Sequence, residues 1–132
     1  MLVSADRIVV GGNIRCDYGL ELDDAGRILR VGPLSQLGQP DLALSRRVIL
    51  PGFVNAHSHA FQRVLRGRTQ IAGPVEDNFW TWRDKMYQAA SKLTPDDVFT
   101  ISRQAFMEMQ LCGVTSVGEF HYVHHQPSGE AY

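Results

Sequence analysis

Two histidines separated by one residue, His57 and His59, are the side chains of this sequence whose type and spacing best suit metal chemistry. They follow an apolar run, 48–54, that is interrupted only by Pro51-Gly52. Alternate side chains of a β-strand leave on the same face, so both imidazoles would point together. Neutral imidazole binds Zn²⁺ and other first-row metals, with Zn–N distances of about 2.0–2.1 Å. The spacing therefore predicts one shared metal ion at the carboxyl end of a buried strand, where α/β barrels place their active sites.

An isolated His-x-His pattern is weak evidence by itself, because most such histidines are exposed or hydrogen-bonded without a metal. The context favours the metal here, since His57 and His59 follow an apolar strand rather than lying in a polar tail. We therefore interpret the pair as metal ligands of the intact protein.

Other polar residues lie close to this strand in the sequence. Gln62 is one turn beyond the histidines, in a short helical segment that Gly67 closes, and it could face the same pocket. Three arginines cluster there, and a solvated basic face is the simpler interpretation of them than an anion site: Arg63, Arg66 and Arg68.

A helix is predicted over 79–92, because apolar residues recur on one face at helical spacing: Phe79, Met86, Tyr87 and Ala90. Such an aromatic face usually packs into a core. Arg83 lies on the same face and is the exception. Its guanidinium either extends to solvent or is held there for a carboxylate.

A second helix should begin at Thr94, because Thr94 is a good N-cap, Pro95 suits the first helical position, and two aspartates follow. Gly113 ends this helix, and 114–117 is a short β-branched strand. Strand, helices and strand in this order predict parallel strands with helical crossovers.

The second strand also ends in polar side chains, and either His121 or Tyr122 could reach the pocket. The sequence pattern does not choose between them. His124 and His125 are adjacent, so they would diverge in a strand and are better interpreted as solvated loop residues.

Residues 1–50 are predicted to be mostly β, with a short strand at 7–10 and a hairpin with one buried face formed by 18–22 and 27–31. The turn of that hairpin is Asp23-Asp24-Ala25-Gly26. Residues 33–46 are predicted to be irregular, and 48–57 to form the strand that bears the histidines. We assign two domains, 1–50 and 51–132.

The chain has 132 residues, of which 44% are hydrophobic and 20% charged, as expected of a globular protein. A net charge of -1, from 13 Lys+Arg and 14 Asp+Glu, gives no reason to expect nucleic acid or an anionic membrane as a partner. No signal peptide or membrane-spanning segment is evident. Cys16 and Cys112 have no metal or redox spacing, so we expect reduced thiols and a cytoplasmic protein.

The segment Leu50-Pro51-Gly52-Phe53-Val54-Asn55-Ala56-His57-Ser58-His59 resembles the first-strand signature of the amidohydrolase superfamily. This resemblance implies an α/β fold: a distorted (β/α)₈ barrel, begun at residue 51 and incomplete in this chain, preceded by the N-terminal strands of a small β-sandwich in residues 1–50. It also implies that His57 and His59 are the first two ligands of one Zn²⁺, which lowers the pKa of a bound water toward about 7.

Three further segments resemble the branch of the superfamily that hydrolyses N-formimino-L-glutamate to N-formyl-L-glutamate and ammonia: 59–63, 79–87 and 119–125. Within them, the resemblance implies that Gln62, Arg83 and Tyr122 bind a small substrate bearing carboxylates. For the full-length protein we expect a homodimer. The remaining metal ligands and the acid/base residues are expected after Tyr132.

A barrel takes roughly 250 residues, so we expect this chain to be the N-terminal part of an enzyme and to be inactive alone. Two alternatives stay open. One is another amidohydrolase, such as a guanine, cytosine or triazine deaminase, which would share the histidines without needing Arg83 for a carboxylate. The other is a small non-catalytic binding domain with incidental histidines.

Overall fold

The computed structural model describes residues 1–69, 78–126 and 128–131. The chain forms two compact units, Met1–Pro51 and Gly52–Tyr132. The first holds strands β1 (Leu2–Val10), β2 (Asn13–Arg15), β3 (Tyr18–Leu22), β4 (Ile28–Pro33) and β5 (Leu42–Ile49) and the short helix α1 (Leu34–Leu37). The second holds β6 (Phe53–Ser58), the 3₁₀ helix η1 (Ala60–Leu65), α2 (Phe79–Ala90), α3 (Pro95–Leu111) and β7 (Val114–Glu119). Within the described residues this is a mixed α/β chain.

Strand β1 is the centre of the first unit. It pairs antiparallel with β2 and β3, and β3 continues the sheet to β4. It also pairs parallel with β5, with Val3 opposite Leu42 and Ile8 opposite Ile49. Leu2, Val3 and Ile8 are buried, and Ile8 is only 1% exposed. The core of this unit therefore lies on β1.

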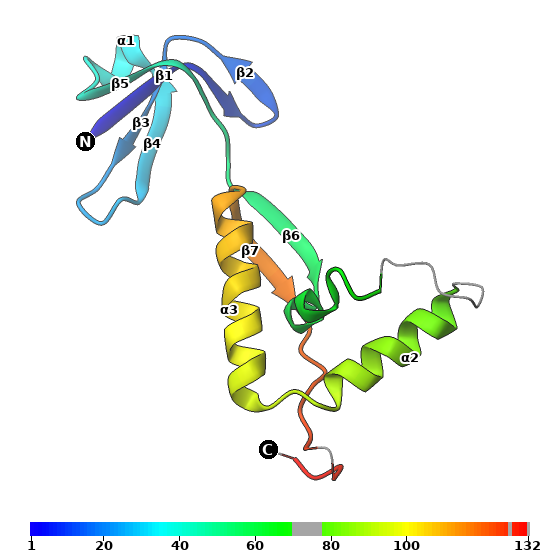
Figure 1. Cartoon of the computed structure of the whole chain (residues 1–132). Helices are drawn as coiled ribbons and strands as arrows, with labels where there is room; N and C mark the ends of the chain where they lie inside the picture. Colours follow the sequence, from blue (N-terminus) through cyan, green and yellow to red (C-terminus); the bar gives the residue numbers. More distant parts are fainter. Residues whose placement is uncertain (70–77, 127, 132) are drawn as a thin grey trace. The chain divides into compact units, whose positions relative to one another are not determined.

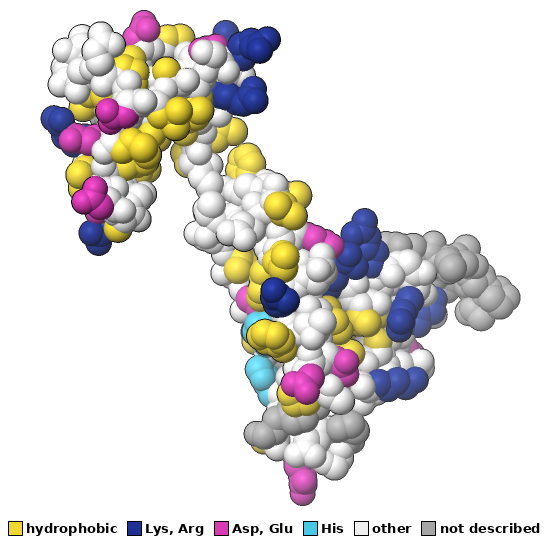
Figure 2. All heavy atoms as spheres, turned by 60° about the vertical axis from the view of Figure 1, so that its left-hand side comes forward, with side chains coloured by type: hydrophobic (Ala, Val, Ile, Leu, Met, Phe, Trp, Pro, Cys, Tyr) yellow, Lys and Arg dark blue, Asp and Glu magenta, His cyan; other side chains and the backbone are white. Residues whose placement is uncertain are grey.

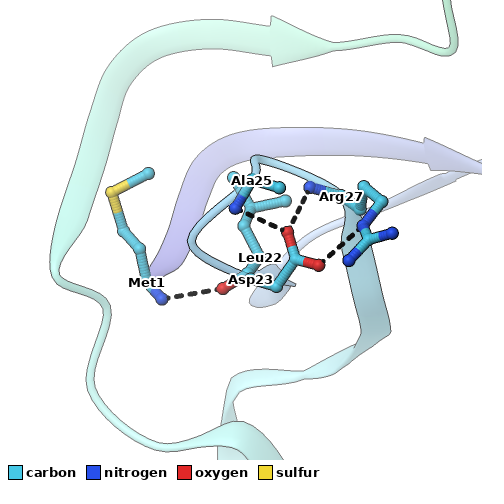
Figure 3. A network of polar contacts seen from close by, with 5 residues as sticks. All are labelled: Met1, Leu22, Asp23, Ala25 and Arg27. Carbon is cyan, nitrogen blue, oxygen red and sulfur yellow. Dashed lines mark hydrogen bonds and ion pairs between the residues drawn. The ribbon is translucent and has the colours of Figure 1, made fainter.

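The predicted hairpin is present, and its turn is built by Asp23 (Figure 3). One carboxylate oxygen, Oδ1, accepts the backbone N–H groups of Ala25 at 3.0 Å and Arg27 at 2.8 Å. The other, Oδ2, accepts Nε of Arg27 at 2.8 Å. Gly26 has a φ of +76°, which glycine adopts without strain. The expected buried face is wrong for β4, because its apolar side chains are 41% to 60% exposed: Ile28, Leu29 and Val31.

Two expectations for residues 33–57 are also wrong. Residues 33–46 are not irregular throughout, since α1 and most of β5 lie there. The strand predicted over 48–57 is two strands, because β5 ends at Ile49 and β6 begins at Phe53. Pro51 between them has no N–H to continue a ladder, which explains the break.

The second unit has the predicted order of strand, helices and strand. Strands β6 and β7 pair parallel, with Phe53 opposite Val114 and Ser58 opposite Glu119. Helix α3 runs beside these two strands (Figure 1). It begins as predicted: Thr94 accepts the N–H of Asp97 at 3.2 Å, and the Asp97 carboxylate accepts the N–H of Thr94 at 3.0 Å.

A small core lies where η1 meets α2. Phe61, Leu65, Met86 and Leu93 are buried there, and Phe61 is 1% exposed. The face of α2 that packs on this core differs from the predicted one, because its members follow the i, i+4, i+7, i+8 spacing from residue 82: Trp82, Met86, Ala89 and Ala90. Phe79 and Tyr87, which were expected in the core, are 62% and 49% exposed.

Candidate metal and substrate site

The Nε2 atoms of the two histidines point toward each other at the carboxyl end of β6. His57 lies in β6, and His59 is the residue that precedes η1. Their Nε2 atoms are 3.1 Å apart, and the ring planes meet at 80°. The alternation of strand side chains explains why both imidazoles leave on one face. The structure thus brings together the two residues that the spacing predicts as ligands.

A backbone carbonyl selects the tautomer of His59. Nδ1 of His59 is 3.0 Å from the carbonyl oxygen of Phe120, in the segment that follows β7. A carbonyl can only accept, so Nδ1 carries the proton and donates it. In the neutral ring Nε2 then keeps its lone pair, and this is the atom that faces His57. A ligating histidine is commonly held in this way.

The 3.1 Å between the two Nε2 atoms is a hydrogen-bonding distance, and it is also close to the spacing that one shared zinc ion would impose. Two nitrogens bound at about 2.0–2.1 Å in a tetrahedral shell lie about 3.3 Å apart, close to the 3.1 Å observed between His57 and His59. Among the described residues there is no group of three or more His, Cys, Asp or Glu side chains that could hold a metal. A catalytic zinc takes three protein ligands, so the described residues could supply only two of them.

Gln62 and Tyr122 are also brought together, beside His59. Nε2 of Gln62 donates to the Tyr122 hydroxyl at 2.5 Å, and that hydroxyl donates to Sδ of Met86 at 3.5 Å. The Tyr122 ring stands edge-on to the rings of His59 and Phe61, at centroid distances of 5.1 and 4.9 Å. The Tyr122 hydroxyl thereby fixes the orientation of the Gln62 amide, and the Tyr122 ring packs against the candidate metal ligand His59.

Arg83 has a different environment. It is exposed on α2, and its guanidinium carbon lies 5.5 Å from the centre of the Trp80 ring and 5.2 Å from that of Tyr87. These are cation–π distances, so the aromatic residues of its own helix hold the guanidinium at the surface. The packed face of α2 turns toward the core instead. A carboxylate-binding function for Arg83 stays a prediction.

Two of the clustered arginines are not simply solvated, because Arg63 and Arg66 both lie within 4.0 Å of the Glu108 carboxylate. Arg63 forms a two-bond ion pair with Glu108 of α3, through Nε at 2.9 Å and Nη2 at 2.7 Å. Hydrogen bonds from Arg63 and then from Gln104 lower the pKa of Glu108 to about 2. The pair fastens η1, which carries Gln62, to α3. Only tertiary structure reveals this partner, which lies 45 residues away.

Glu119 is a site residue to which the sequence pattern assigns no function. Its side chain is 9% exposed at the carboxyl end of β7. Oε1 accepts the backbone N–H of Ala60 at 2.8 Å and lies 3.6 Å from Nδ1 of His121. Its position in the sequence could have identified it, because Glu119 is the first carboxylate after the strand predicted over 114–117.

An apolar groove of about 1220 Å³ runs between α3 and β7. Val98, Phe106 and Val117 are among its lining residues, together with His121 and His124. Histidine side chains lie next to apolar ones on the surface of the second unit in Figure 2. His57 and His59 do not line this groove, so it is separate from the histidine pair.

A family model described as the amidohydrolase family matches residues 48–131. The chain belongs to the amidohydrolase family. The match covers more than half of the chain and contains both histidines.

Among the described residues, no helix is long and apolar enough to cross a membrane.

Individual amidohydrolases are similar to this chain over stretches of different length. Formimidoylglutamate deiminase of Pseudomonas aeruginosa is 48% identical over 84 residues, which are 64% of this chain and 18% of that protein. 8-Oxoguanine deaminase of the same organism is 30% identical over 108 residues, 80% of this chain and 23% of that protein. An amidohydrolase crystal structure from Brucella melitensis matches with a TM-score of 0.84 at 31% identity, over 99% of this chain and 29% of that one. The chain thus spans about a fifth of the length of these two curated relatives.

Proposed function

We propose that the complete protein containing this chain hydrolyses N-formimino-L-glutamate to N-formyl-L-glutamate and ammonia. The observation that carries the proposal is the facing pair of Nε2 atoms, 3.1 Å apart, in a chain 48% identical to a formimidoylglutamate deiminase over 84 residues. β6 and β7 would be the first two strands of a (β/α)₈ barrel, and the first unit part of a β-sandwich.

His57 and His59 would hold the metal through Nε2, and the Phe120 carbonyl keeps the lone pair of His59 on that atom. One Zn²⁺ bound there supplies Lewis acidity and activates water at neutral pH. The other ligands and the general acid/base would come from parts of the complete protein outside this chain. This chain would therefore contribute two of the metal ligands and some of the residues that bind the substrate.

A neutral amide and a positively charged guanidinium would recognise the substrate. Gln62 offers an amide whose orientation the Tyr122 hydroxyl fixes. Arg83 would pair with a substrate carboxylate, because a guanidinium presents two parallel N–H donors to the two oxygens. In this structure its guanidinium lies against Trp80 and Tyr87, so it would leave or share that contact on binding.

A purine deaminase is the second candidate, because 8-oxoguanine deaminase of P. aeruginosa is 30% identical over 80% of this chain. Such a substrate carries no carboxylate and would not need Arg83. Ammonia release from N-formimino-L-glutamate and from 8-oxoguanine separates the two candidates directly.

We expect the complete protein to release ammonia from N-formimino-L-glutamate and not from 8-oxoguanine. Arg83→Met should raise KM about 10- to 150-fold, the equivalent of losing about 1.5–3 kcal/mol of charge-assisted hydrogen bonding. The bound metal should be retained. Steady-state kinetics with metal analysis measures both quantities.

Arg103→Met is the matched control, because Arg103 is also exposed but lies on α3. Its KM should equal that of the unmodified protein. An unchanged KM in Arg83→Met removes Arg83 from the substrate site. Ammonia release from 8-oxoguanine alone would replace the proposed reaction with the second candidate.

A further inference from the structure

Glu119 stands beside the histidine pair in the sheet. It is the last residue of β7, and the ladder places it opposite Ser58, the residue between His57 and His59. Its side chain is 9% exposed. A carboxylate is rarely buried to this extent unless its charge is paired or lies close to a metal ion.

The segment Glu119-Phe120 holds the chain around His59 at three points. Oε1 of Glu119 accepts the N–H of Ala60, the residue after His59, at 2.8 Å. The N–H of Phe120 donates to the Ser58 carbonyl at 3.0 Å, and the Phe120 carbonyl accepts Nδ1–H of His59 at 3.0 Å. The backbone on both sides of His59 and its ring are therefore tied to the end of β7.

The second carboxylate oxygen of Glu119 is not explained by the contact with the Ala60 backbone. Oε2 of Glu119 is buried and has no hydrogen-bond partner among the residues that the structure describes. A glutamine would accept the N–H of Ala60 equally well without burying a charge. A buried, half-satisfied carboxylate costs free energy that a nearby positive charge offsets. His121, with Nδ1 3.6 Å from Oε1, supplies such a charge only when it is protonated, whereas a divalent cation at the histidine pair would supply it whether or not His121 is protonated.

We propose that Glu119 is a positioning residue of the metal centre, an inference that rests on the metal site of the proposed function. Its Oε1 fixes the turn that aims His59 at His57, and its negative charge favours a divalent cation held by these two neutral imidazoles. Residues that support metal ligands in this way commonly change metal affinity 10- to 100-fold.

The test is metal affinity of the complete protein, measured with Zn²⁺ against a competing chelator. Glu119→Gln keeps an acceptor for Ala60 and removes the charge, so Kd should rise about 10-fold. Glu119→Ala removes both, so Kd should rise about 100-fold. The absorption spectrum of bound Co²⁺ should change in both variants, since it reports ligand geometry. The metal-free Glu119→Gln protein should unfold at a temperature no lower than that of the unmodified protein, because it no longer buries a charge.

Glu21→Gln is the matched control, because it removes a carboxylate that pairs with Arg30 in the first unit rather than with the segment around His59. Its Kd and Co²⁺ spectrum should be unchanged. If Glu119→Gln binds Zn²⁺ with unchanged Kd and spectrum, the positioning function is refuted.

A second pair of variants separates this failure from failure of the proposed function. His57→Ala should lose the metal, whereas His124→Ala, which changes an exposed histidine, should keep it. Full metal retention in His57→Ala overturns the metal site itself. Loss in His57→Ala together with unchanged binding in Glu119→Gln overturns only the inference about Glu119.

Discussion

The polar networks around Asp23 and around His59 differ in the sequence separation of their members. Asp23 binds groups two and four residues away and closes one turn (Figure 3). The contacts around His59 join residues about 60 apart: 61 for His59 with Phe120, 60 for Gln62 with Tyr122, and 59 for Ala60 with Glu119. The first network makes local structure, whereas the second places side chains that could bind a metal and a substrate. A site of this kind depends on the packing of its whole unit, and a turn does not.

The largest expected effect comes from removing a buried side chain from each unit in turn. Phe61→Ala should destabilise the second unit by about 3–5 kcal/mol, because Phe61 is 1% exposed and packs against Tyr122. Metal affinity should fall with it. Thermal unfolding and chelator competition on the complete protein measure both effects.

Ile8→Ala is the corresponding variant of the first unit, where Ile8 is also 1% exposed. It should cost about 2–5 kcal/mol. Metal affinity measured well below its unfolding transition should be unchanged. An equal loss of metal affinity in Phe61→Ala and Ile8→Ala would show that the site does not depend on the second unit alone.

A smaller effect is expected from one hydroxyl of the long-range network. Tyr122→Phe removes the acceptor of the Gln62 amide while keeping the ring against His59. The net loss of about 0.5–1.5 kcal/mol corresponds to a KM about 2- to 12-fold higher, with the metal retained. Steady-state kinetics on N-formimino-L-glutamate measures the change. A KM equal to that of the unmodified protein would show that substrate binding does not depend on the hydrogen bond between Gln62 and the Tyr122 hydroxyl.

The smallest effects concern stability in acid. The pKa of Glu108 is lowered from 4.5 to about 2, chiefly by its hydrogen bonds from Arg63. A carboxylate with a lowered folded-state pKa stabilises the fold above its unfolded value and loses that contribution as pH falls through the folded value. Glu108→Gln should therefore destabilise the protein at pH 6 and flatten the loss of stability between about pH 4.5 and pH 2.

Asp23→Asn is the counterpart in the first unit. The pKa of Asp23 is lowered by hydrogen bonding to the backbone and then the side chain of Arg27, so the sign is the same. The effect should be smaller than for Glu108→Gln, because this exposed network closes one local turn. Denaturant unfolding at several pH values measures both variants. A larger effect for Asp23→Asn than for Glu108→Gln would contradict this ranking of the two carboxylates.

Much of the local structure could be predicted from the sequence. The turn at Asp23, the cap at Thr94 and the strand–helix–strand order all depend on neighbouring residues and are present. Predictions failed where a distant partner decides the outcome. Strand β5 pairs with β1, about 40 residues away, and the packed face of α2 is chosen by Phe61 and Leu65 rather than by its own aromatic pattern.

The candidate site divides in the same way. Alternation along a strand is a local property, so the sequence by itself determined that His57 and His59 leave on one face. The positions of Gln62 and Tyr122 after the two strands placed them near the pocket, their substrate-binding function was expected from a resemblance, and their hydrogen bond appears only in the folded chain. The tautomer of His59 and the burial of Glu119 were decided by tertiary structure alone. The physical reason is that β6 and β7 must pair before groups about 60 residues apart can exchange a hydrogen bond.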